Sequence, residues 1–369
     1  MNRFPGRLAL QQRVLPSYRV PFFDLLAEAC DGGLTLFAGQ PRPEESIASG
    51  QPRIAQLTPA QNVHLLHGPL YLCYQRGFID WLEQTDPDAL IVEANPRYLA
   101  TSAAVKWMRR RGRPILGWGL GSPSLSGPLS GFRQTRRLAF LCQFDRLLAY
   151  SQRGADEYAA LGFPREKIFV AHNSVSPRPT QPPTRPLSTF QTPPSLLFVG
   201  RLQSRKRVDL LLRACAQLDS HPHLVIVGDG PERETLEALA REVYPSAQFI
   251  GAKHGDELKP YFAEADLFVL PGTGGLAVQE AMSHGLPVIV AQGDGTQDDL
   301  VRAGNGWQIP PDDFGTLLAT LRDALSDPAR LRAMGAESYR IVSEEINVEK
   351  MVEVFVRALN EVAPRSEST

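Results

Sequence analysis

The chain alternates short apolar runs with segments whose apolar residues recur every three or four positions. In the first half, the apolar runs are bounded by polar or turn-forming residues, which is typical of buried strands. Segments 21–30 (PFFDLLAEAC) and 97–111 have helical spacing, and the first begins with the proline that helix starts favour. This alternation predicts a parallel sheet with helices between its strands. The expected strands are Leu8–Leu10, Leu34–Ala38, Val63–Leu66, Ala89–Glu93, Ile115–Trp118 and Arg146–Ala149.

Residues 177–195 interrupt the alternation with seven prolines, which predicts a semi-rigid linker. The same alternation then restarts and predicts a second parallel sheet. Its strands are expected at 196–199, 224–227, 248–250 and 267–270, and its helices at 207–218, 232–242, 256–263, 314–326 and 328–343. We therefore expect two α/β domains with doubly wound parallel sheets, 1–185 and 186–345, and a C-terminal segment, 346–369, whose helix packs back on the first domain.

The segment 265–290 (ADLFVLPGTGGLAVQEAMSHGLPVIV) carries the clearest chemistry. It predicts a buried strand, a glycine turn and a helix that opens near Leu276. Ligands of open α/β sheets bind where strands end and helices begin, and free N–H groups at a helix start favour a phosphate. The backbone around Gly274 and Gly275 is thus expected to face an anion. Glu280, one turn into the helix, is expected to accept two hydroxyl hydrogen bonds from a ribose.

Two cations follow the first strand of the second domain, in the stretch SLLFVGRLQSRKR. Arg201 grips two oxygens at once and Lys206 acts as a point charge, so together they suit a diphosphate. The alternative is that both are exposed residues of a helix start, where positive charge is mildly unfavourable. The turn Gly228–Asp229–Gly230–Pro231 is a weaker signal. His254 has two interpretations, a residue that borders a base pocket and a satisfied or exposed loop histidine, of which the second is favoured.

Composition adds an asymmetry to this picture. The 369 residues are 43% apolar and 21% charged, which is typical of a globular protein of two domains. Residues 1–185 hold 22 Lys and Arg against 14 Asp and Glu, whereas residues 186–369 hold 17 against 26. A basic first half favours an anionic partner, such as a phosphorylated acceptor or an anionic membrane surface, against the alternative of a chance surface imbalance.

The remaining signals exclude several classes of protein. No apolar run approaches a membrane span, and no signal peptide is expected at the N-terminus. The four scattered cysteines are expected to be reduced thiols of a cytoplasmic protein. No metal site and no cofactor are expected, because no His, Cys or Asp cluster has ligand spacing. Nucleic acid is a poor fit, because the basic run 109–113 ends a helix and stacking motifs are absent.

The series VGRL…K, VGDGP, ADLFVLP and QEAMSHGLPVIV resembles the donor-binding domain of the retaining family-four glycosyltransferases (glycosyl transferases group 1), and the first half resembles their acceptor domain. The resemblance covers essentially the whole chain. It implies the GT-B fold, two Rossmann-like domains facing a central cleft that closes around the donor. It implies that the diphosphate of the donor is held by Arg201, Lys206 and the amides of Gly275, Leu276 and Ala277, and its ribose by Glu280. The remaining donor candidates are Gly200, Gly228, Gly230, His254 and Gly274.

The chain departs from the family pattern at two positions. Gly272 stands where the family has a first glutamate, eight residues before Glu280, that contacts the donor sugar. The nearest equivalents of a histidine that the family commonly has after the strand ILGW are Gly119, Leu120 and Gly121, and none of them can hydrogen-bond through its side chain. The glycine-rich first loop of many members is also replaced. In its place the acceptor-binding candidates are Arg13, Tyr18, Arg19 and Arg97.

The resemblance implies a metal-independent transferase that moves a sugar, with retention of configuration, from a UDP- or GDP-sugar to a glycan, lipid-linked or small-molecule acceptor in polysaccharide or glycoconjugate biosynthesis. A peripheral encounter with the inner face of the membrane is a further expectation, from the basic stretches 109–113 and 133–137. Because of Gly272 and Leu120, a non-catalytic nucleotide-sugar-binding subunit is the alternative function. A sugar-nucleotide epimerase is a third one.

Overall fold

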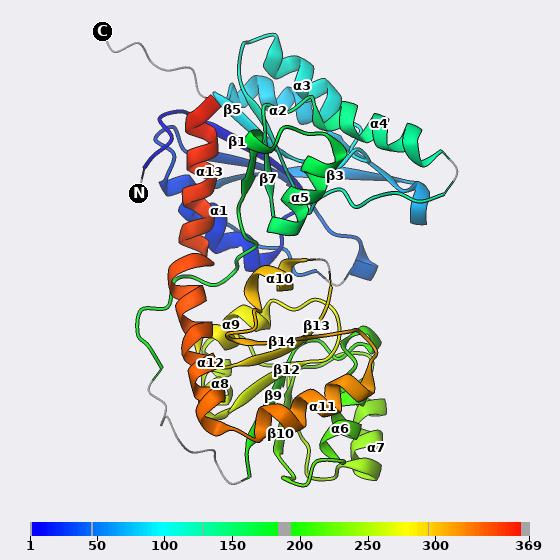
Figure 1. Cartoon of the computed structure of the whole chain (residues 1–369). Helices are drawn as coiled ribbons and strands as arrows, with labels where there is room; N and C mark the ends of the chain where they lie inside the picture. Colours follow the sequence, from blue (N-terminus) through cyan, green and yellow to red (C-terminus); the bar gives the residue numbers. More distant parts are fainter. Residues whose placement is uncertain (1, 46, 128, 184–192, 294, 363–369) are drawn as a thin grey trace. The chain divides into compact units, whose positions relative to one another are not determined.

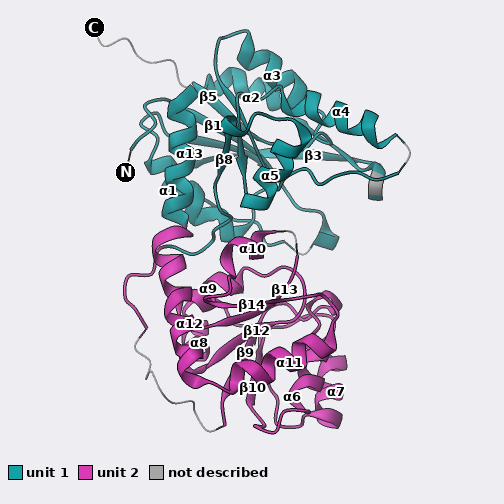
Figure 2. Ribbon diagram, viewed as in Figure 1, with its two compact units in different colours: residues 1–177, 348–369 teal, residues 178–347 magenta. Residues whose placement is uncertain are grey.

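The computed structural model describes residues 2–45, 47–127, 129–183, 193–293 and 295–362. These residues form two compact units, 1–177 with 348–369 and 178–347 (Figure 2). The chain thus leaves the first unit after Pro177 and returns to it at Val348, and the expected domain boundary at 185/186 lies outside the described residues.

The first unit is built on an eight-stranded sheet with the order β4-β3-β2-β1-β5-β6-β7-β8. All neighbouring strands are parallel except β3 and β4, so the expectation of an all-parallel sheet is wrong at this edge. The antiparallel partner was missed because Leu72–Arg76 follows β3 closely and has no long apolar run. The strands are β1 (Leu8–Val14), β2 (Leu34–Gly39), β3 (Gln56–Leu65), β4 (Leu72–Arg76), β5 (Ala89–Glu93), β6 (Ile115–Gly119), β7 (Arg146–Ala149) and β8 (Ile168–Val170).

Helices cover both faces of this sheet and bury two separate apolar layers (Figure 1). One layer joins α1 to the C-terminal helix α13, where Phe355 lies 4.9 Å from Phe22 and 5.1 Å from Trp118 between ring centroids. The helix from 348 to 362 therefore belongs to the first unit. The helices are α1 (Val20–Glu28), α2 (Phe78–Thr85), α3 (Thr101–Arg109), α4 (Ser130–Leu141), α5 (Gln152–Leu161) and α13 (Val348–Val362).

The helix expected from 97 begins only at Thr101. The preceding loop is held in another conformation, because the N–H of Leu99 donates to the carbonyl of Cys73 on β4 and the N–H of Arg97 donates to Asn95 Oδ1. These bonds keep Arg97 and Tyr98 at the end of β5, where they line a pocket described below.

The second unit has a six-stranded, fully parallel sheet with the order β11-β10-β9-β12-β13-β14 around one apolar core. Inside it, the Asp266 carboxylate accepts the N–H of Ser195 at 2.9 Å and pairs with the buried Arg332 guanidinium. The helix expected over 328–343 ends at Arg340 and continues as a π-helix, Ile341–Glu345. The strands of the second unit are β9 (Ser195–Val199), β10 (His223–Val227), β11 (Gln248–Gly251), β12 (Leu267–Leu270), β13 (Val288–Ala291) and β14 (Gly306–Ile309). Its helices are α6 (Val208–Cys215), α7 (Arg233–Val243), α8 (Lys259–Glu264), α9 (Ala277–Ser283), α10 (Thr296–Leu300), α11 (Phe314–Leu325) and α12 (Pro328–Arg340).

Candidate functional site

Lys206 meets the glycine turn at the carboxyl edge of the second sheet. It ends a single 3-10 turn after β9, and only 5% of the residue is exposed. Its ammonium donates to the carbonyl of Thr273 at 3.0 Å and to that of Gly274. Burial and the neighbouring Arg205 lower the pKa of Lys206 to about 8. The structure therefore holds a poorly solvated cation, partnered by neutral carbonyls, against the turn that the sequence singled out.

The absence of a glutamate at position 272 has a packing reason. A Cβ on Gly272 would lie 2.1 Å from the carbonyl oxygen of Arg205 and 2.5 Å from Cα of Lys206. The N–H of Thr273 also donates to the same Arg205 carbonyl at 3.1 Å. The backbone that carries Lys206 thus occupies the space that any side chain at 272 would need.

Glu280 lies in α9, the short helix that follows this turn. Leu276 is the residue before its first turn and Ala277 its first residue, so the helix begins where the sequence predicted. Burial raises the pKa of Glu280 above its usual value. No donor among the described residues bonds to its carboxylate, which leaves both oxygens available to hydroxyl groups.

A cavity of about 560 Å³ opens beside these loops, between the ends of β9, β10 and β11. It is lined by Gly200, Arg201, Gly228, Gly230 and His254, all predicted from the sequence. Two of these glycines also have a packing role. A Cβ on Gly228 would lie 1.9 Å from the carbonyl oxygen of Gly200, and one on Gly230 would lie 2.2 Å from that of Leu202.

Sequence reasoning missed three polar residues of this edge. Asp229 and Lys253 line the same cavity. The guanidinium of Arg205 lies 3.5 Å from the Thr273 carbonyl, beside Lys206. The run SRKR was the available signal for Arg205, since three of its four residues are cationic and only Lys206 was selected.

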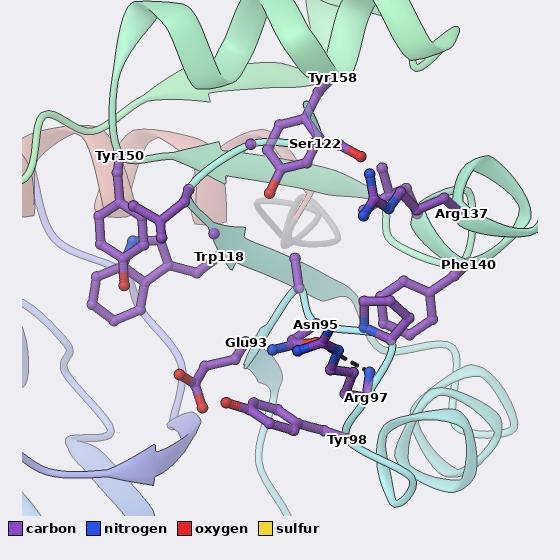
Figure 3. Close-up of a pocket in the computed structure, with 16 residues that line it drawn as sticks. Glu93, Asn95, Arg97, Tyr98, Trp118, Ser122, Arg137, Phe140, Tyr150 and Tyr158 are labelled. Carbon is purple, nitrogen blue, oxygen red and sulfur yellow. Dashed lines mark hydrogen bonds between the residues drawn. The ribbon is translucent and has the colours of Figure 1, made fainter. Parts of the chain in front are cut away.

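The first unit has its own pocket at the carboxyl edge of its sheet, about 400 Å³ in volume (Figure 3). Arg97, Arg137 and Phe140 lie on one side of it, and Trp118 and Tyr150 lie across from them. The buried hydroxyl of Ser122 lines it and finds no hydrogen-bond partner among the described residues. A concave site with aromatic walls and unused polar groups is suited to a polar organic ligand. The full lining is Glu93, Ala94, Asn95, Pro96, Arg97, Tyr98, Trp118, Gly119, Leu120, Gly121, Ser122, Arg137, Phe140, Leu141, Tyr150 and Tyr158.

Glu93, the last residue of β5, brings a carboxyl group to this pocket. It accepts the backbone N–H of Arg13 at 2.5 Å. Burial raises the pKa of Glu93 to about 7, although that hydrogen bond and the charge of Arg13 oppose the shift. Glu93 is therefore poised to hold or release a proton near neutral pH. Its sequence signal was a carboxylate directly after four apolar residues of a predicted strand, ALIVE.

The four acceptor candidates occupy different environments. Arg97 lines the pocket. Arg13 forms an ion pair with Glu45 at 2.9 Å. Arg19 is 6% exposed, donates to Asn173 Oδ1 and lies 5.3 Å from the Trp118 ring centroid. Tyr18 is 44% exposed and, like Arg13 and Arg19, is absent from the pocket lining. The structure thus brings only Arg97 of this set to the pocket.

Within the described part of the chain, no group of three or more His, Cys, Asp or Glu residues is arranged to hold a metal ion. None of the described helices is both long enough and apolar enough to cross a membrane.

Comparison with known sequences points to one family. Residues 184–341 match the model for glycosyl transferases group 1. A GDP-mannose-dependent alpha-mannosyltransferase of Corynebacterium glutamicum is 37% identical over 151 residues, which cover 40% of this chain and 35% of that protein. The protein of the same name from Mycobacterium tuberculosis is 34% identical over 197 residues, 50% of this chain and 47% of that protein. The aligned part of the chain thus spans less than half the length of either relative.

Comparison with solved structures covers both units. HepE of Anabaena, solved in complex with UDP, has a TM-score of 0.67 and 16% sequence identity, and the match covers 98% of this chain and 100% of that one. A lipopolysaccharide outer core galactosyltransferase, WaaB, has a TM-score of 0.67 and 17% identity, with 96% and 99% covered. Together with the two parallel-sheet units, these likenesses confirm the expected fold. The chain has the GT-B fold, and the match to the model for glycosyl transferases group 1 is confined to residues 184–341.

Proposed function

We propose that the protein is a glycosyltransferase that moves a sugar from a nucleoside diphosphate-sugar, bound by the second unit, to a hydroxyl of an acceptor bound in the pocket of the first. The observation that carries the proposal is the buried ammonium of Lys206 against the glycine turn. A buried cation without a carboxylate partner is costly to keep charged, and an arriving diphosphate offsets that cost.

The relatives support a GDP- or UDP-sugar as the donor. Two matched proteins are named GDP-mannose-dependent, and the Anabaena structure contains UDP. The name of a lipopolysaccharide core biosynthesis glycosyltransferase of Rhizobium meliloti, matched over 76% of this chain, favours polysaccharide or glycoconjugate biosynthesis as the setting. Because the matched relatives from Corynebacterium, Mycobacterium and Rhizobium are named transferases, they do not favour a non-catalytic subunit.

In this proposal, each polar group of the second unit has one task. Arg201 and Lys206 stabilise the negative charge that develops on the diphosphate as the glycosidic bond breaks. The amides of Gly275, Leu276 and Ala277 add donors at the start of α9. The unpaired carboxylate of Glu280 accepts the ribose hydroxyls.

The transfer step needs neither a protein base nor a metal ion. The bond between the anomeric carbon and the diphosphate oxygen breaks, and the acceptor oxygen bonds to the same face of that carbon. The acceptor proton passes to an oxygen of the leaving phosphate. Attack and departure on one face retain the configuration, and Arg201 and Lys206 supply the positive charge that a metal would otherwise supply.

Calorimetric titration of UDP and GDP into the wild type and the variants Arg201→Ala and Lys206→Ala tests this site. We expect a loss of affinity of tenfold or more in each variant, because a hydrogen bond to a charged group contributes about 1.5–3 kcal/mol. Arg213→Ala, on the exposed side of α6, is the matched control and is expected to bind as the wild type does. Unchanged affinity in both site variants would overturn the assignment.

A second measurement separates the transferase from a binding subunit. Wild-type protein is incubated with the nucleotide-sugar that binds best, and release of nucleoside diphosphate is followed with and without acceptors. Acceptor-dependent release supports transfer. Tight binding without turnover across phosphorylated, lipid-linked and free-sugar acceptors would refute it.

A further inference from the structure

A second cavity, about 500 Å³ in volume, adjoins the pocket of the first unit. Helix α4 and the loop after β5 line it, and four of its lining residues are arginines: Arg97, Arg133, Arg136 and Arg137. Arg97 and Arg137 line both cavities, so they stand at the boundary between them. Figure 3 shows both side chains on the Phe140 side of the pocket. A strongly cationic wall therefore continues directly from the pocket that we assign to the acceptor.

Three of these arginines, Arg133, Arg136 and Arg137, carry charges that are poorly neutralised. Burial lowers the pKa of Arg137 below its usual value, and the positive charges of Arg133 and Arg97 lower it further. Among the described residues, no carboxylate forms an ion pair with Arg133, Arg136 or Arg137. The nearby Glu157, which favours the charge of Arg137, is engaged with Arg153 at 3.5 Å. Like charges held together without counter-charges are unfavourable until an anion binds.

The guanidinium groups of Arg136 and Arg137 also keep unused donors. Arg137 donates one bond, to the carbonyl of Pro123 at 3.0 Å, and the Arg136 guanidinium lies 5.8 Å from the Phe132 ring centroid. Each guanidinium has five N–H donors in a planar fork that matches two oxygens of a phosphate. Several forks around one cavity concentrate more positive charge than a single carboxylate would neutralise, which favours phosphate or diphosphate.

We propose that the acceptor carries a phosphate or diphosphate group, which Arg97, Arg133 and Arg137 bind while the part that bears the reacting hydroxyl occupies the adjoining pocket. That this anion site binds the acceptor rests on the proposed transferase function. Such an acceptor would be either a soluble phosphorylated sugar or a lipid-linked diphosphate, which share this chemistry.

The test is calorimetric titration of inorganic pyrophosphate into the double variant Arg133→Gln with Arg137→Gln. Every protein compared also carries Arg201→Ala, which weakens the diphosphate site proposed in the second unit. The control is Arg76→Gln with Arg110→Gln, which removes the same charge from exposed positions of the same unit. We expect pyrophosphate to bind at least tenfold more weakly to the double variant and within about twofold of the parent to the control. Equal dissociation constants for pyrophosphate in the double variant and the control would overturn the proposal.

Titration of farnesyl diphosphate and farnesol distinguishes a lipid-linked diphosphate acceptor from a soluble phosphorylated one. Farnesyl diphosphate that binds more than tenfold tighter than pyrophosphate, with no binding of farnesol, supports a lipid-linked acceptor. Equal binding of the two diphosphates supports a soluble one. Co-sedimentation with phosphatidylglycerol vesicles that depends on Arg133 and Arg137, without any pyrophosphate binding, would replace the proposal with a membrane contact.

The outcome is independent of the proposed function. Titration of UDP and GDP into Arg133→Gln with Arg137→Gln, on the otherwise wild-type chain, reports on the second unit and is expected to match the wild type. If the wild type binds no nucleotide but binds pyrophosphate through these arginines, the donor assignment fails while the anion site stands. If nucleotide binds normally and the affinity for pyrophosphate does not depend on Arg133 and Arg137, only the anion-site proposal fails.

Discussion

The two units place their candidate sites at equivalent edges of similar sheets but build them from different parts of the chain. In the second unit, the site is largely backbone: glycine turns pack against one another so closely that a single Cβ on Gly228 or Gly272 would overlap a neighbouring carbonyl. In the first unit, the site is made of long side chains, among them Glu93, Arg97 and Arg137.

This difference explains which site the sequence revealed. A backbone-built site restricts both residue type and spacing, so glycines and a fixed lysine leave a recognisable pattern. A pocket built from side chains requires only that the right side chains meet in space. Its residues can come from several loops, so they leave no fixed spacing in the sequence. We therefore expect the second unit to be sensitive to small substitutions and the first to be sensitive to changes of charge.

The largest effect is expected from Gly272→Ala. The added methyl group would overlap the backbone of Arg205 and Lys206, and forcing atoms into packed sites costs about 1–3 kcal/mol or more. We expect thermal denaturation to show a loss of stability at the upper end of that range, with loss of nucleotide binding. Gly131→Ala is the control, because nothing lies within 4 Å of its Cβ position in α4. Similar melting temperatures for the two variants would contradict the backbone-built site.

The next effect is expected from Glu93→Gln, which keeps the shape of the side chain but removes its charge. Above pH 7, where Glu93 is ionised, we expect a ten- to hundredfold slower transfer, since the hydrogen bond by which its charged oxygen would orient the acceptor hydroxyl is lost. Nucleotide affinity is expected to remain unchanged. A variant with wild-type transfer rates would remove Glu93 from the acceptor site.

The same variant has a pH signature. Because the folded protein raises the pKa of Glu93 from 4.5 to about 7, it binds more protons than the unfolded chain between these values. The contribution of Glu93 to stability is therefore present below about pH 4.5 and is lost as the pH rises through about 7. Denaturation across this range is expected to show a weaker fall in stability for Glu93→Gln than for the wild type. Parallel curves would argue against the raised pKa.

A smaller effect is expected from pH on the second unit. The protonated form of Lys206 binds an anion, and its pKa is lowered to about 8. Nucleotide affinity is thus expected to fall by about tenfold between pH 7 and pH 9, as the free protein loses this proton. Lys206→Arg keeps its charge over this range, so whatever affinity it retains is expected to be independent of pH. A wild-type affinity that is flat across pH 8 would contradict this role.

The smallest effect is expected from Leu120→His, which restores the residue that many family members have. Leu120 is 53% exposed, so the change is expected to alter stability by less than about 0.5 kcal/mol and nucleotide affinity by less than twofold. The contrast with Gly272 sharpens the comparison: packing leaves no room for a side chain at position 272, whereas the exposed position 120 accepts a different one. Severe destabilisation by Leu120→His would show that both are locked.

The alternation of apolar runs and helical segments in the sequence predicted two α/β units, because parallel strands buried on both faces must be apolar along their length. The GT-B fold itself was predicted from the resemblance to a known family. The sequence placed Lys206 and the glycine turn after the carboxyl ends of two strands, and the strand order of the structure makes those strands neighbours. The sequence analysis missed β4 and the short edge strands β8 and β14. It also assigned residues 97–100 to a helix, although hydrogen bonds to β4 hold them in another conformation.

The tertiary structure alone decided the first unit's site and the meaning of Gly272. Glu93 and Arg97 come from the end of β5 and the loop after it, Arg137 comes from α4 some forty residues later, and nothing in this spacing along the chain requires the two segments to meet at one pocket. Likewise, the sequence shows only that Gly272 replaces an expected glutamate, whereas the structure shows that the backbone of Arg205 and Lys206 packs against it. Local pattern determines which elements form, whereas the approach of side chains and backbones between those elements is a property of their packing.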